Sequence, residues 1–258
     1  MHSDQYQTVL STVDQYGVRT LSLNRPECLN AMNRQLIEEV GCAFAEANSD
    51  DRTRAIIFTG AGRAFCAGDD RRAHVHPESE AQARDLVDAI QQATRAIVYG
   101  DKPVVGAING WAVGGGFEWA INCDFPIWAE SARAFFPEVS LNLFVTGAVT
   151  SLLPALVGLN KAREMLLLGG QYTAQELVVL GVAWRVVADE LLMNEAHKLA
   201  CQLSALPPLA VRAMKRVLNQ SSSCDLNRAM QLETEATIAG FLDPETTARL
   251  KNFKRASP

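Results

Sequence analysis

The sequence predicts an α/β fold in which strand–turn–helix units follow one another like the steps of a staircase, with a helical region at the end of the chain. Short buried strands begin at Ala55 and Val104, and each is followed by a glycine-containing turn and a helical segment. After Gly147 the apolar periodicity becomes almost wholly helical. This repetition favours a staircase of βα units over one doubly wound sheet, and it leaves the order of the strands in space open.

Composition places the chain among soluble globular proteins. Its 258 residues suffice for one large domain or for a core with an appendage, and they are 48% hydrophobic and 21% charged. The net charge of −5 argues against broad binding of nucleic acid or of anionic membranes. The most apolar window, residues 104–129, is rich in glycine and is interrupted by Glu118 and Asp124, so we expect no membrane-spanning helix.

Cysteines and histidines indicate the compartment and argue against a metal site. Six cysteines are scattered without a C-x-x-C pair, which in a chain of this length indicates reduced, buried thiols in a cytoplasmic protein. The polar residues 1–5 show no secretory signal, in agreement with that location. The four histidines form no H-x-x-x-H pair with a third ligand nearby, so we expect no bound metal.

The N-terminal half supplies its elements in a clear order. Residues 6–14 and 18–23 alternate apolar and polar side chains, which predicts a β-hairpin. An amphipathic helix with Met32 and Phe44 on one face follows and ends at residues 48–50. The remaining elements expected in this half are a strand at 55–58, a loop at 64–70, a helix at 79–99, a strand at 104–108 and a strand at 125–128.

The C-terminal half is expected to consist of helices. Their predicted ranges are 148–156, 161–168, 174–180, 190–203, 208–219 and 225–241. The break at Leu206-Pro207-Pro208 divides the chain into a core, residues 1–205, and a helical C-terminal region, residues 206–258. The tail from residue 244 is basic around Leu250 and Phe253, which is compatible with a solvated face or with a ligand or subunit contact.

The stretch at residues 102–124 is the centre of the functional argument. Its apolar strand leads into Gly114-Gly115-Gly116, and Glu118 lies about one turn into the helix that follows. A helix start leaves free backbone N–H groups, and glycine lets a ligand approach them because no Cβ intervenes. These donors suit an oxygen that develops negative charge, with the Glu118 carboxylate beside it as a proton carrier.

The glycine stretch admits other structural and functional interpretations. The spacing does not fit the G-x-G-x-x-G dinucleotide motif, and no Lys-Ser or Lys-Thr follows as in a phosphate loop. A tight turn required by close packing remains an open structural interpretation of the three glycines taken alone.

Two more segments complete a possible site. The loop at residues 66–69 follows one buried strand, as the three glycines follow another, so each segment can offer one N–H group to the same oxygen. A second carboxylate, Glu138, stands in Phe136-Pro137-Glu138, twenty residues beyond Glu118. Two N–H donors and two glutamates suit chemistry beside a thioester carbonyl, where an enolate oxygen is stabilised and protons move at neighbouring carbons.

These motifs, in this order, resemble the crotonase family, the enoyl-CoA hydratase/isomerase superfamily, over nearly the whole chain. The resemblance rests on residues 23–27 with 30–33, 64–68 with Asp70, 102–124, 136–138, and Gly181-Val182 with Val186-Val187. It implies a crotonase-like spiral of repeated ββα units with a helical C-terminal trimerisation region. It also implies assembly as a homotrimer or a dimer of trimers.

The resemblance further implies roles for individual residues. The substrate is an acyl-CoA thioester whose carbonyl oxygen accepts hydrogen bonds from the N–H groups of Asp69 and Gly115, while Glu118 and Glu138 form the catalytic pair. In family hydratases this pair holds a water that adds to the β-carbon while a proton reaches the α-carbon. No separate cofactor is needed, because coenzyme A arrives with the substrate. The residues expected to bind substrate or CoA are Arg25, Ala67, Gly68, Asp70, Gly114, Phe144, Phe253 and Lys254.

The resemblance therefore predicts a cytoplasmic, enoyl-CoA hydratase-like enzyme. Paired carboxylates favour hydration over double-bond isomerisation, which can proceed with one acid. Isomerisation and a carnitinyl-CoA-type dehydration remain alternatives on the same scaffold. A catalytically impaired acyl-CoA-binding subunit is the alternative from a different class of protein.

The sequence departs from the family pattern in three places. Asp69 stands where a small or apolar residue is frequent. Residues 141–149 replace most of the small residues that in hydratases help to seat the water and shape the acyl pocket, and Phe144 adds bulk there. Cys28 stands where a basic residue is frequent near the CoA phosphates. The basic groups left for that contact are Arg25, Arg71, Arg72 and the C-terminal tail.

Overall fold

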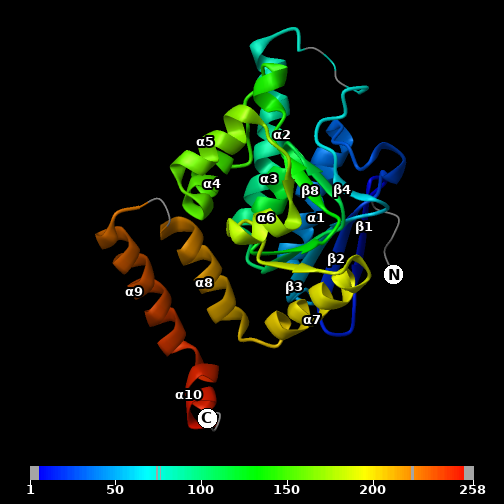
Figure 1. Ribbon diagram of the computed structural model, residues 1–258. Coiled ribbons are helices and arrows are strands. Elements are labelled where there is room, and N and C mark those ends of the chain that lie inside the picture. The colour runs from blue at the N-terminus through cyan, green and yellow to red at the C-terminus, as the bar shows by residue number, and fades with distance from the viewer. Residues whose placement is uncertain (1–5, 74, 76, 222–223, 253–258) are drawn as a thin grey trace.

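The computed structural model describes residues 6–73, 75, 77–221 and 224–252 (Figure 1). Its strands are β1 (Val9–Val13), β2 (Val18–Leu23), β3 (Ala55–Gly60), β4 (Ala64–Cys66), β5 (Val104–Ile108), β6 (Trp111–Val113), β7 (Phe125–Ala129), β8 (Arg133–Phe135), β9 (Tyr172–Thr173) and β10 (Arg185–Val187). They form two sheets. The larger has the order β1-β2-β3-β5-β7-β10, and the smaller has the order β4-β6-β8-β9.

The repeating unit consists of two strands and a helix. β3, β4 and α2 (Glu80–Val98) form one unit, and β5, β6 and α3 (Gly115–Ile121) form the next. The first strand of each unit joins the larger sheet and the second joins the smaller sheet, with parallel pairing between units. This arrangement confirms the predicted α/β spiral of ββα units. Because β4 and β6 are parallel neighbours, the segments that follow them leave the same edge of the smaller sheet side by side.

The predicted hairpin and first helix are confirmed. β1 pairs antiparallel with β2, with Val9 opposite Leu23. After the short helix η1 (Pro26–Cys28), α1 (Arg34–Ser49) begins at an Asn33 cap whose side chain accepts a hydrogen bond from the Leu36 N–H at 2.9 Å. The apolar face of α1 packs into the core. The spacing of apolar residues along the sequence therefore predicted both the type of these elements and the face that each buries.

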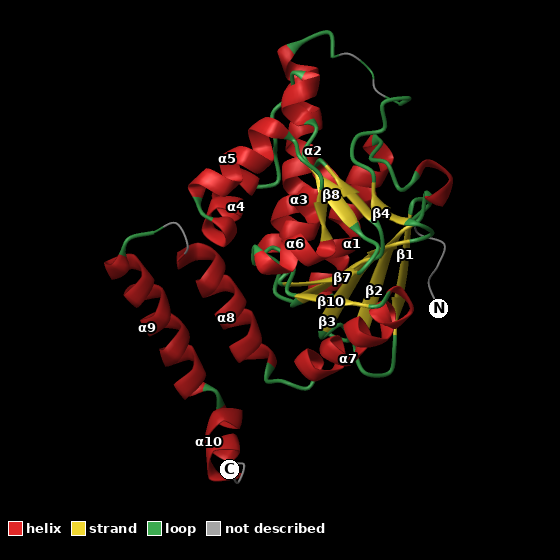
Figure 2. Ribbon diagram, viewed as in Figure 1, coloured by secondary structure: helices red, strands yellow, loops and turns green. Residues whose placement is uncertain are grey.

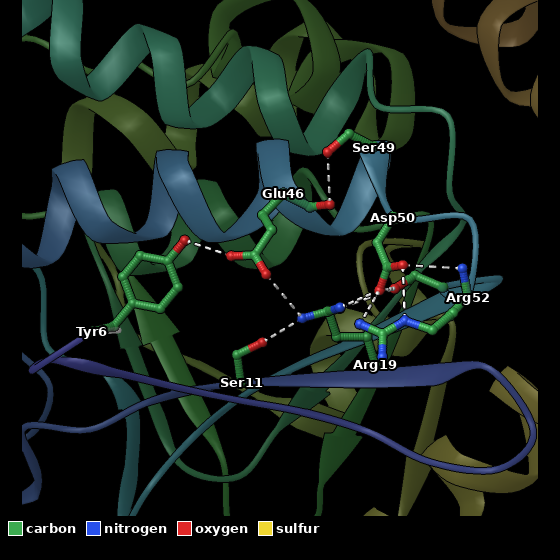
Figure 3. A network of polar contacts seen from close by, with 8 residues as sticks. Tyr6, Ser11, Arg19, Glu46, Ser49, Asp50 and Arg52 are labelled. Atoms are coloured by element: carbon green, nitrogen blue, oxygen red, sulfur yellow. Dashed lines mark hydrogen bonds and ion pairs between the residues drawn. The ribbon is translucent and has the colours of Figure 1, made fainter. Parts of the chain in front are cut away.

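A buried arginine ties the hairpin to the end of α1 (Figure 3). Arg19 on β2 is 5% exposed, and its guanidinium donates to Ser11 Oγ at 2.9 Å and to Asp50 Oδ2 at 2.5 Å. The Glu46 carboxylate lies 3.7 Å from the same guanidinium and accepts a hydrogen bond from the Tyr6 hydroxyl at 3.0 Å. The acceptors from β1 and α1 satisfy a charge that would otherwise be costly to bury.

The sequence pattern missed the shortest strands. β4 lies inside the predicted loop at 64–70, and β6 separates the predicted strand at 104–108 from the glycines. The expectation of an almost wholly helical second half is wrong at β9 and β10. Strands of two or three residues are too short to display alternation, and they exist because a neighbouring strand supplies hydrogen bonds.

Helices make up most of the second half. They are α4 (Val149–Val157), α5 (Leu159–Leu168), α6 (Ala174–Val179), α7 (Leu192–Ser204), α8 (Pro208–Ser221), α9 (Leu226–Leu242) and α10 (Pro244–Asn252), with the short helices η2 (Glu138–Leu141) and η3 (Asp189–Leu191). Helix α7 packs across β2, β3, β5 and β7, and Figure 2 shows it against the larger sheet. The predicted helical segments are thus confirmed apart from shifts of a few residues at their ends.

Helices α8, α9 and α10 extend from the body of the molecule, coloured orange to red in Figure 1. Helix α8 is anchored by Lys215, which is 7% exposed and pairs with Asp124 Oδ2 at 2.8 Å. The same ammonium donates to the carbonyl oxygens of Ile97 at 2.9 Å and Lys102 at 3.0 Å. The start of α8 agrees with the break seen in the sequence, whereas the division into two domains remains a prediction.

All six cysteines carry free thiols in the structure, but most of them are not buried. Only Cys66 and Cys123 are buried, so the prediction of buried thiols is wrong for Cys28, Cys42, Cys201 and Cys224. Cys42, for example, occupies the exposed side of α1, where the helical period places it away from the core. Over the residues that the structure describes, no helix is long and apolar enough to cross a membrane.

We expect Lys215→Met to destabilise the chain by up to about 3 kcal/mol, because the Asp124 carboxylate, whose side chain is only 19% exposed, would lose its counter-charge. Urea denaturation at pH 7 measures the loss. A double variant that also carries Asp124→Asn should lose less, since a neutral amide can still accept the Val104 N–H that now donates to the carboxylate at 2.7 Å. Equal losses in the single and double variants would contradict an anchoring ion pair.

Candidate active site

The glycine turn between β6 and α3 leaves no room for side chains. Gly114 has a φ of +51°, and a Cβ placed on it would lie 2.4 Å from Glu138 Oε1. A Cβ placed on Gly116 would lie 2.3 Å from the carbonyl oxygen of Cys66 in β4. Close packing therefore explains these two glycines. The same turn also starts α3, whose first N–H groups have no acceptor within the helix, so packing and N–H donation are compatible.

The loop that follows β4 runs beside the glycine turn. Gly68 has a φ of +81°, and a Cβ placed on it would lie 2.7 Å from the carbonyl oxygen of the last residue of β6. Met32 touches both segments, since its backbone pairs with Asp69 in an isolated parallel bridge. Its Sδ would lie 2.9 Å from a Cβ placed on Gly115. Asp69 and Gly115 thus occupy adjacent segments, as the prediction of a shared oxyanion hole requires.

An ion pair between Arg25 and Asp70 holds the end of the loop that follows β4. Arg25 lies 2.9 Å from Asp70 Oδ2, and the two side chains are 17% and 9% exposed. The arginine also donates to the carbonyl oxygen of Ala31. Burial tends to raise the pKa of Asp70, but the hydrogen bonds from Arg25 and from the Arg72 N–H outweigh it and hold that pKa below its usual value. Arg25 therefore supports the loop, and its contact with CoA remains a prediction.

Glu118 is held in a fixed orientation inside the protein. It lies in the first turn of α3 and is 2% exposed. The neighbouring Phe117 stacks on Phe136 with ring centroids 4.6 Å apart, which fixes the helix against the second acidic motif. Thr146 donates its N–H to Glu118 Oε1 and its hydroxyl to Oε2, each at 2.7 Å. Burial raises the pKa of Glu118, while these two hydrogen bonds oppose the rise.

Glu138 lies in a different environment at the start of η2. It is 9% exposed, and its Oε2 has no hydrogen-bond partner among the residues that the structure describes. Burial, together with the charge of Glu118, raises the pKa of Glu138 to about 7. Both glutamates meet the same glycine turn, since a Cβ placed on Gly114 would lie 2.4 Å from Glu138 Oε1 and the Gly114 carbonyl oxygen accepts the Glu118 N–H at 2.9 Å. The structure therefore brings the two predicted glutamates into one site.

The remaining predicted site residues are distributed around this centre. The Ala67 N–H donates to the carbonyl oxygen of Leu29 at 3.0 Å, which holds the same loop. Phe144 is 80% exposed and so does not fill the space beside Glu118 within this chain. Arg71 and Arg72 are exposed. Phe253 and Lys254 lie outside the described residues. Contacts of all these groups with a substrate remain predictions.

Thr146 was missed by the sequence reasoning as a residue of the site. It stands in the segment that departs from the family pattern, and no periodicity or motif marks it. Gly147 was missed as well. Its φ is +54°, and a Cβ placed on it would lie 2.7 Å from Glu118 Oε2. A polar residue followed by a glycine in an irregular loop is too common a signal to identify such a contact. Among the described residues, no group of three His, Cys, Asp or Glu side chains could hold a metal ion.

A spiral of ββα units with a glycine turn, an adjacent loop and two neighbouring buried carboxyl groups defines a chain of the crotonase fold class. The sequence profile described as enoyl-CoA hydratase/isomerase matches residues 14–248. A crotonyl-CoA hydratase of Syntrophomonas wolfei is 36% identical over 217 residues, which cover 84% of this chain and 83% of the relative. A 1,2-epoxyphenylacetyl-CoA isomerase of Escherichia coli is 34% identical over 232 residues, covering 88% and 87%.

Solved structures agree with the sequence relatives. The enoyl-CoA hydratase of Bacillus anthracis is similar with a TM-score of 0.89 at 32% identity, covering 95% of this chain and 96% of the other. The chain therefore belongs to the enoyl-CoA hydratase/isomerase family. It is a crotonase-family enzyme with enoyl-CoA hydratase-like function.

We expect Gly114→Ala to destabilise the chain more than Gly158→Ala. Both glycines have positive φ, so both variants carry backbone strain on the order of 1–3 kcal/mol. Only the methyl group at position 114 would also meet the Glu138 carboxyl, which adds roughly 1–3 kcal/mol of overpacking, because nothing lies within 4 Å of a Cβ at position 158. Free energies of unfolding in urea measure the difference. Equal losses would show that position 114 tolerates a side chain.

Proposed function

We propose that the chain adds water to, or removes it from, the 2,3 double bond of a 2-enoyl-CoA thioester. The observation that carries the proposal is the pair of buried carboxyl groups, Glu118 and Glu138, whose residues both contact the glycine turn that starts α3. The adjacent segments with Asp69 and Gly115 add backbone donors for a thioester oxygen. Relatives named as crotonyl-CoA and short-chain-enoyl-CoA hydratases support the same chemistry.

In the proposed reaction every proton has a carrier. The thioester oxygen accepts hydrogen bonds from the N–H groups of Asp69 and Gly115, which stabilises the enolate that forms as electrons leave the double bond. The water oxygen bonds to the β-carbon while one proton of the water passes to a glutamate carboxylate. The other glutamate donates a proton to the α-carbon as the enolate collapses. One water is consumed and no electron is transferred, so we propose that no separate cofactor takes part. Dehydration follows the same path in reverse.

The two buried carboxyls favour hydration over isomerisation. The relatives support hydratase-like function, and those of comparable identity also include an enzyme named as a 1,2-epoxyphenylacetyl-CoA isomerase, so the site residues are needed to favour one reaction. Moving a double bond requires one group that carries a proton from one carbon to another. Hydration requires a base for the water and an acid for the α-carbon at the same time, and a carboxyl group with a pKa of about 7 can serve near neutral pH.

The proposed assembly is a homotrimer or a dimer of trimers, in a cytoplasmic setting. The extended helices support self-association, because their apolar side chains are largely exposed in the single chain. These side chains are Met214, Leu218, Leu226, Met230, Ile238, Phe241, Leu242 and Leu250. Six free thiols support a reducing compartment.

We expect Glu118→Gln and Glu138→Gln each to lower kcat/KM for hydration of crotonyl-CoA by about 10²- to 10⁴-fold, because each removes one proton carrier. Loss of the absorbance of the conjugated enoyl thioester measures the rate, and calorimetry with a non-reactive acyl-CoA checks that binding is kept. Glu130→Gln, at an exposed position, is the matched control and should leave the rate unchanged.

Two outcomes would overturn the hydratase proposal. Conversion of a 3-enoyl-CoA into the conjugated thioester without hydration would assign isomerisation instead. Tight binding of acyl-CoA with no turnover of crotonyl-CoA or of longer 2-enoyl analogues would assign a binding subunit.

The assembly is tested by light scattering coupled to size-exclusion chromatography. We expect a mass of three or six chains, and Phe241→Glu should shift it toward the single chain because a charge would enter an apolar interface. Gln231→Glu places the same charge at another exposed position of α9 and should leave the mass unchanged. A single-chain mass for the unaltered protein would contradict the proposed assembly.

A further inference from the structure

Thr146 donates hydrogen bonds to both carboxyl oxygens of Glu118, the first of the two proposed catalytic glutamates. Its N–H donates to Glu118 Oε1 at 2.7 Å, and its hydroxyl donates to Glu118 Oε2 at 2.7 Å. Both distances are typical of strong hydrogen bonds to an ionised carboxylate. A group that receives two such bonds is stabilised in its charged form.

The backbone around Thr146 holds these donors in place. Its carbonyl oxygen accepts the Val149 N–H at 3.1 Å, at the start of α4. Gly147 adopts a φ of +54°, and a Cβ there would lie 2.7 Å from Glu118 Oε2 and 2.8 Å from Glu118 Cβ. The turn therefore packs directly against the glutamate side chain. The other end of the same loop is bound to the second acidic motif, since the Leu143 N–H donates to the Glu138 carbonyl oxygen at 2.9 Å.

Glu138 receives weaker support, because the hydrogen bond that acts on its carboxyl group comes from its own backbone N–H and not from a neighbouring loop. Its Oε2 is buried without a hydrogen-bond partner among the described residues. A buried carboxyl group in this position is more stable when it carries a proton, and the negative charge of Glu118 nearby adds to that preference. The two glutamates thus differ mainly in the hydrogen bonds that the loop at residues 138–149 donates to their carboxyl groups.

Few other charges act on Glu118. Among the elements packed against α3, β6 and α4 contain no titratable side chain, and β4 contributes only the buried Cys66 thiol, whose pKa is raised to about 12 by burial. In η2, Glu138 itself is the titratable residue, and the charge of Glu118 acts on it. The two hydrogen bonds from Thr146 are therefore the local feature that makes Glu118 easier to ionise than Glu138.

We propose that Thr146 is a positioning residue that keeps Glu118 ionised, as the base that takes the proton of the water, and so leaves the exchangeable proton on Glu138, as the acid that serves the α-carbon. This inference rests on the proposed hydration chemistry for its catalytic meaning. The electrostatic part, that the Thr146 hydroxyl decides which glutamate holds the proton, concerns the resting protein and can be tested without turnover.

The hydroxyl is tested with Thr146→Val, which has nearly the same shape, and with Thr146→Ser, which restores the hydroxyl. In the unaltered enzyme, kcat/KM should fall at low pH as Glu118 is protonated and at high pH as Glu138 loses its proton. Thr146→Val should shift the midpoint of the low-pH fall in kcat/KM to a pH about one unit higher, because ionised Glu118 loses the hydrogen bond from the hydroxyl. At pH values below the low-pH midpoints of both proteins, kcat/KM of the variant should therefore be roughly tenfold lower than that of the unaltered enzyme. Near the pH optimum, kcat/KM should change little. Thr146→Ser should keep the original limb.

Thr150→Val is the matched control. It removes the same hydroxyl at an exposed position of α4, and its profile should coincide with that of the unaltered enzyme. Thermal unfolding of each variant checks the fold, and Thr146→Ala replaces the valine variant if the latter does not fold. An unmoved low-pH limb in the folded variant without the hydroxyl would overturn the proposal. A limb moved equally by Thr146→Ser would overturn it too.

A second readout separates this proposal from the proposed function. Glutamate labelled with ¹³C at the carboxyl carbon gives resonances for positions 118 and 138, assigned by their loss in Glu118→Gln and Glu138→Gln. We expect Glu118 to titrate at lower pH than Glu138, and Thr146→Val to reduce or reverse that order. If no enoyl-CoA is hydrated, the proposed function fails while this titration still decides the role of Thr146. If hydration is observed but the order is unchanged in Thr146→Val, only the present inference fails.

Discussion

Two carboxyl groups share a buried space in this protein, and much of the surrounding structure serves to keep them there. Glu118 is 2% exposed and Glu138 is 9% exposed, so neither can rely on water to stabilise a charge. Two ionised groups in such a place repel each other, and the pair is therefore most stable with one proton between them near neutral pH. That state contains a base and an acid together, which is the combination that addition of water to a double bond requires.

Close approach of backbone segments makes this arrangement possible. The parallel pairing of β4 with β6 places the loop of Gly68 beside the turn of Gly114. At these positions a side chain would strike a carbonyl oxygen or the Glu138 carboxyl group itself. Glycine costs conformational entropy, but here it lets the segments approach closely, and the first N–H groups of α3 have no acceptor within the helix. Stacking of Phe117 on Phe136 then fixes the distance between the two acidic motifs.

The segment after Glu138 shows how one scaffold accommodates a different local sequence. Residues 141–149 lack most of the small residues expected from the family pattern, yet they form a turn that reaches back to Glu118. Phe144, the bulkiest of them, is 80% exposed and does not fill the space beside the carboxyl pair. The altered sequence therefore changes the hydrogen bonding of Glu118 more than the volume around it. Thr146 supplies a hydroxyl donor to Glu118, which a glycine could not do.

The sequence by itself determined the elements whose patterns are long and local. The hairpin, α1, α2, the buried strands β3, β5 and β7 and most later helices follow from apolar periodicity, and the motifs around Glu118 and Glu138 follow from residue type and order. The tertiary structure alone decided the short strands, the use of Arg25 to brace Asp70, and the contact of Thr146 with Glu118. These features depend on segments that are distant along the chain and become neighbours only through the parallel pairing of the spiral. Local periodicity carries no information about such contacts, because it records which face of an element is buried and not what is packed against it.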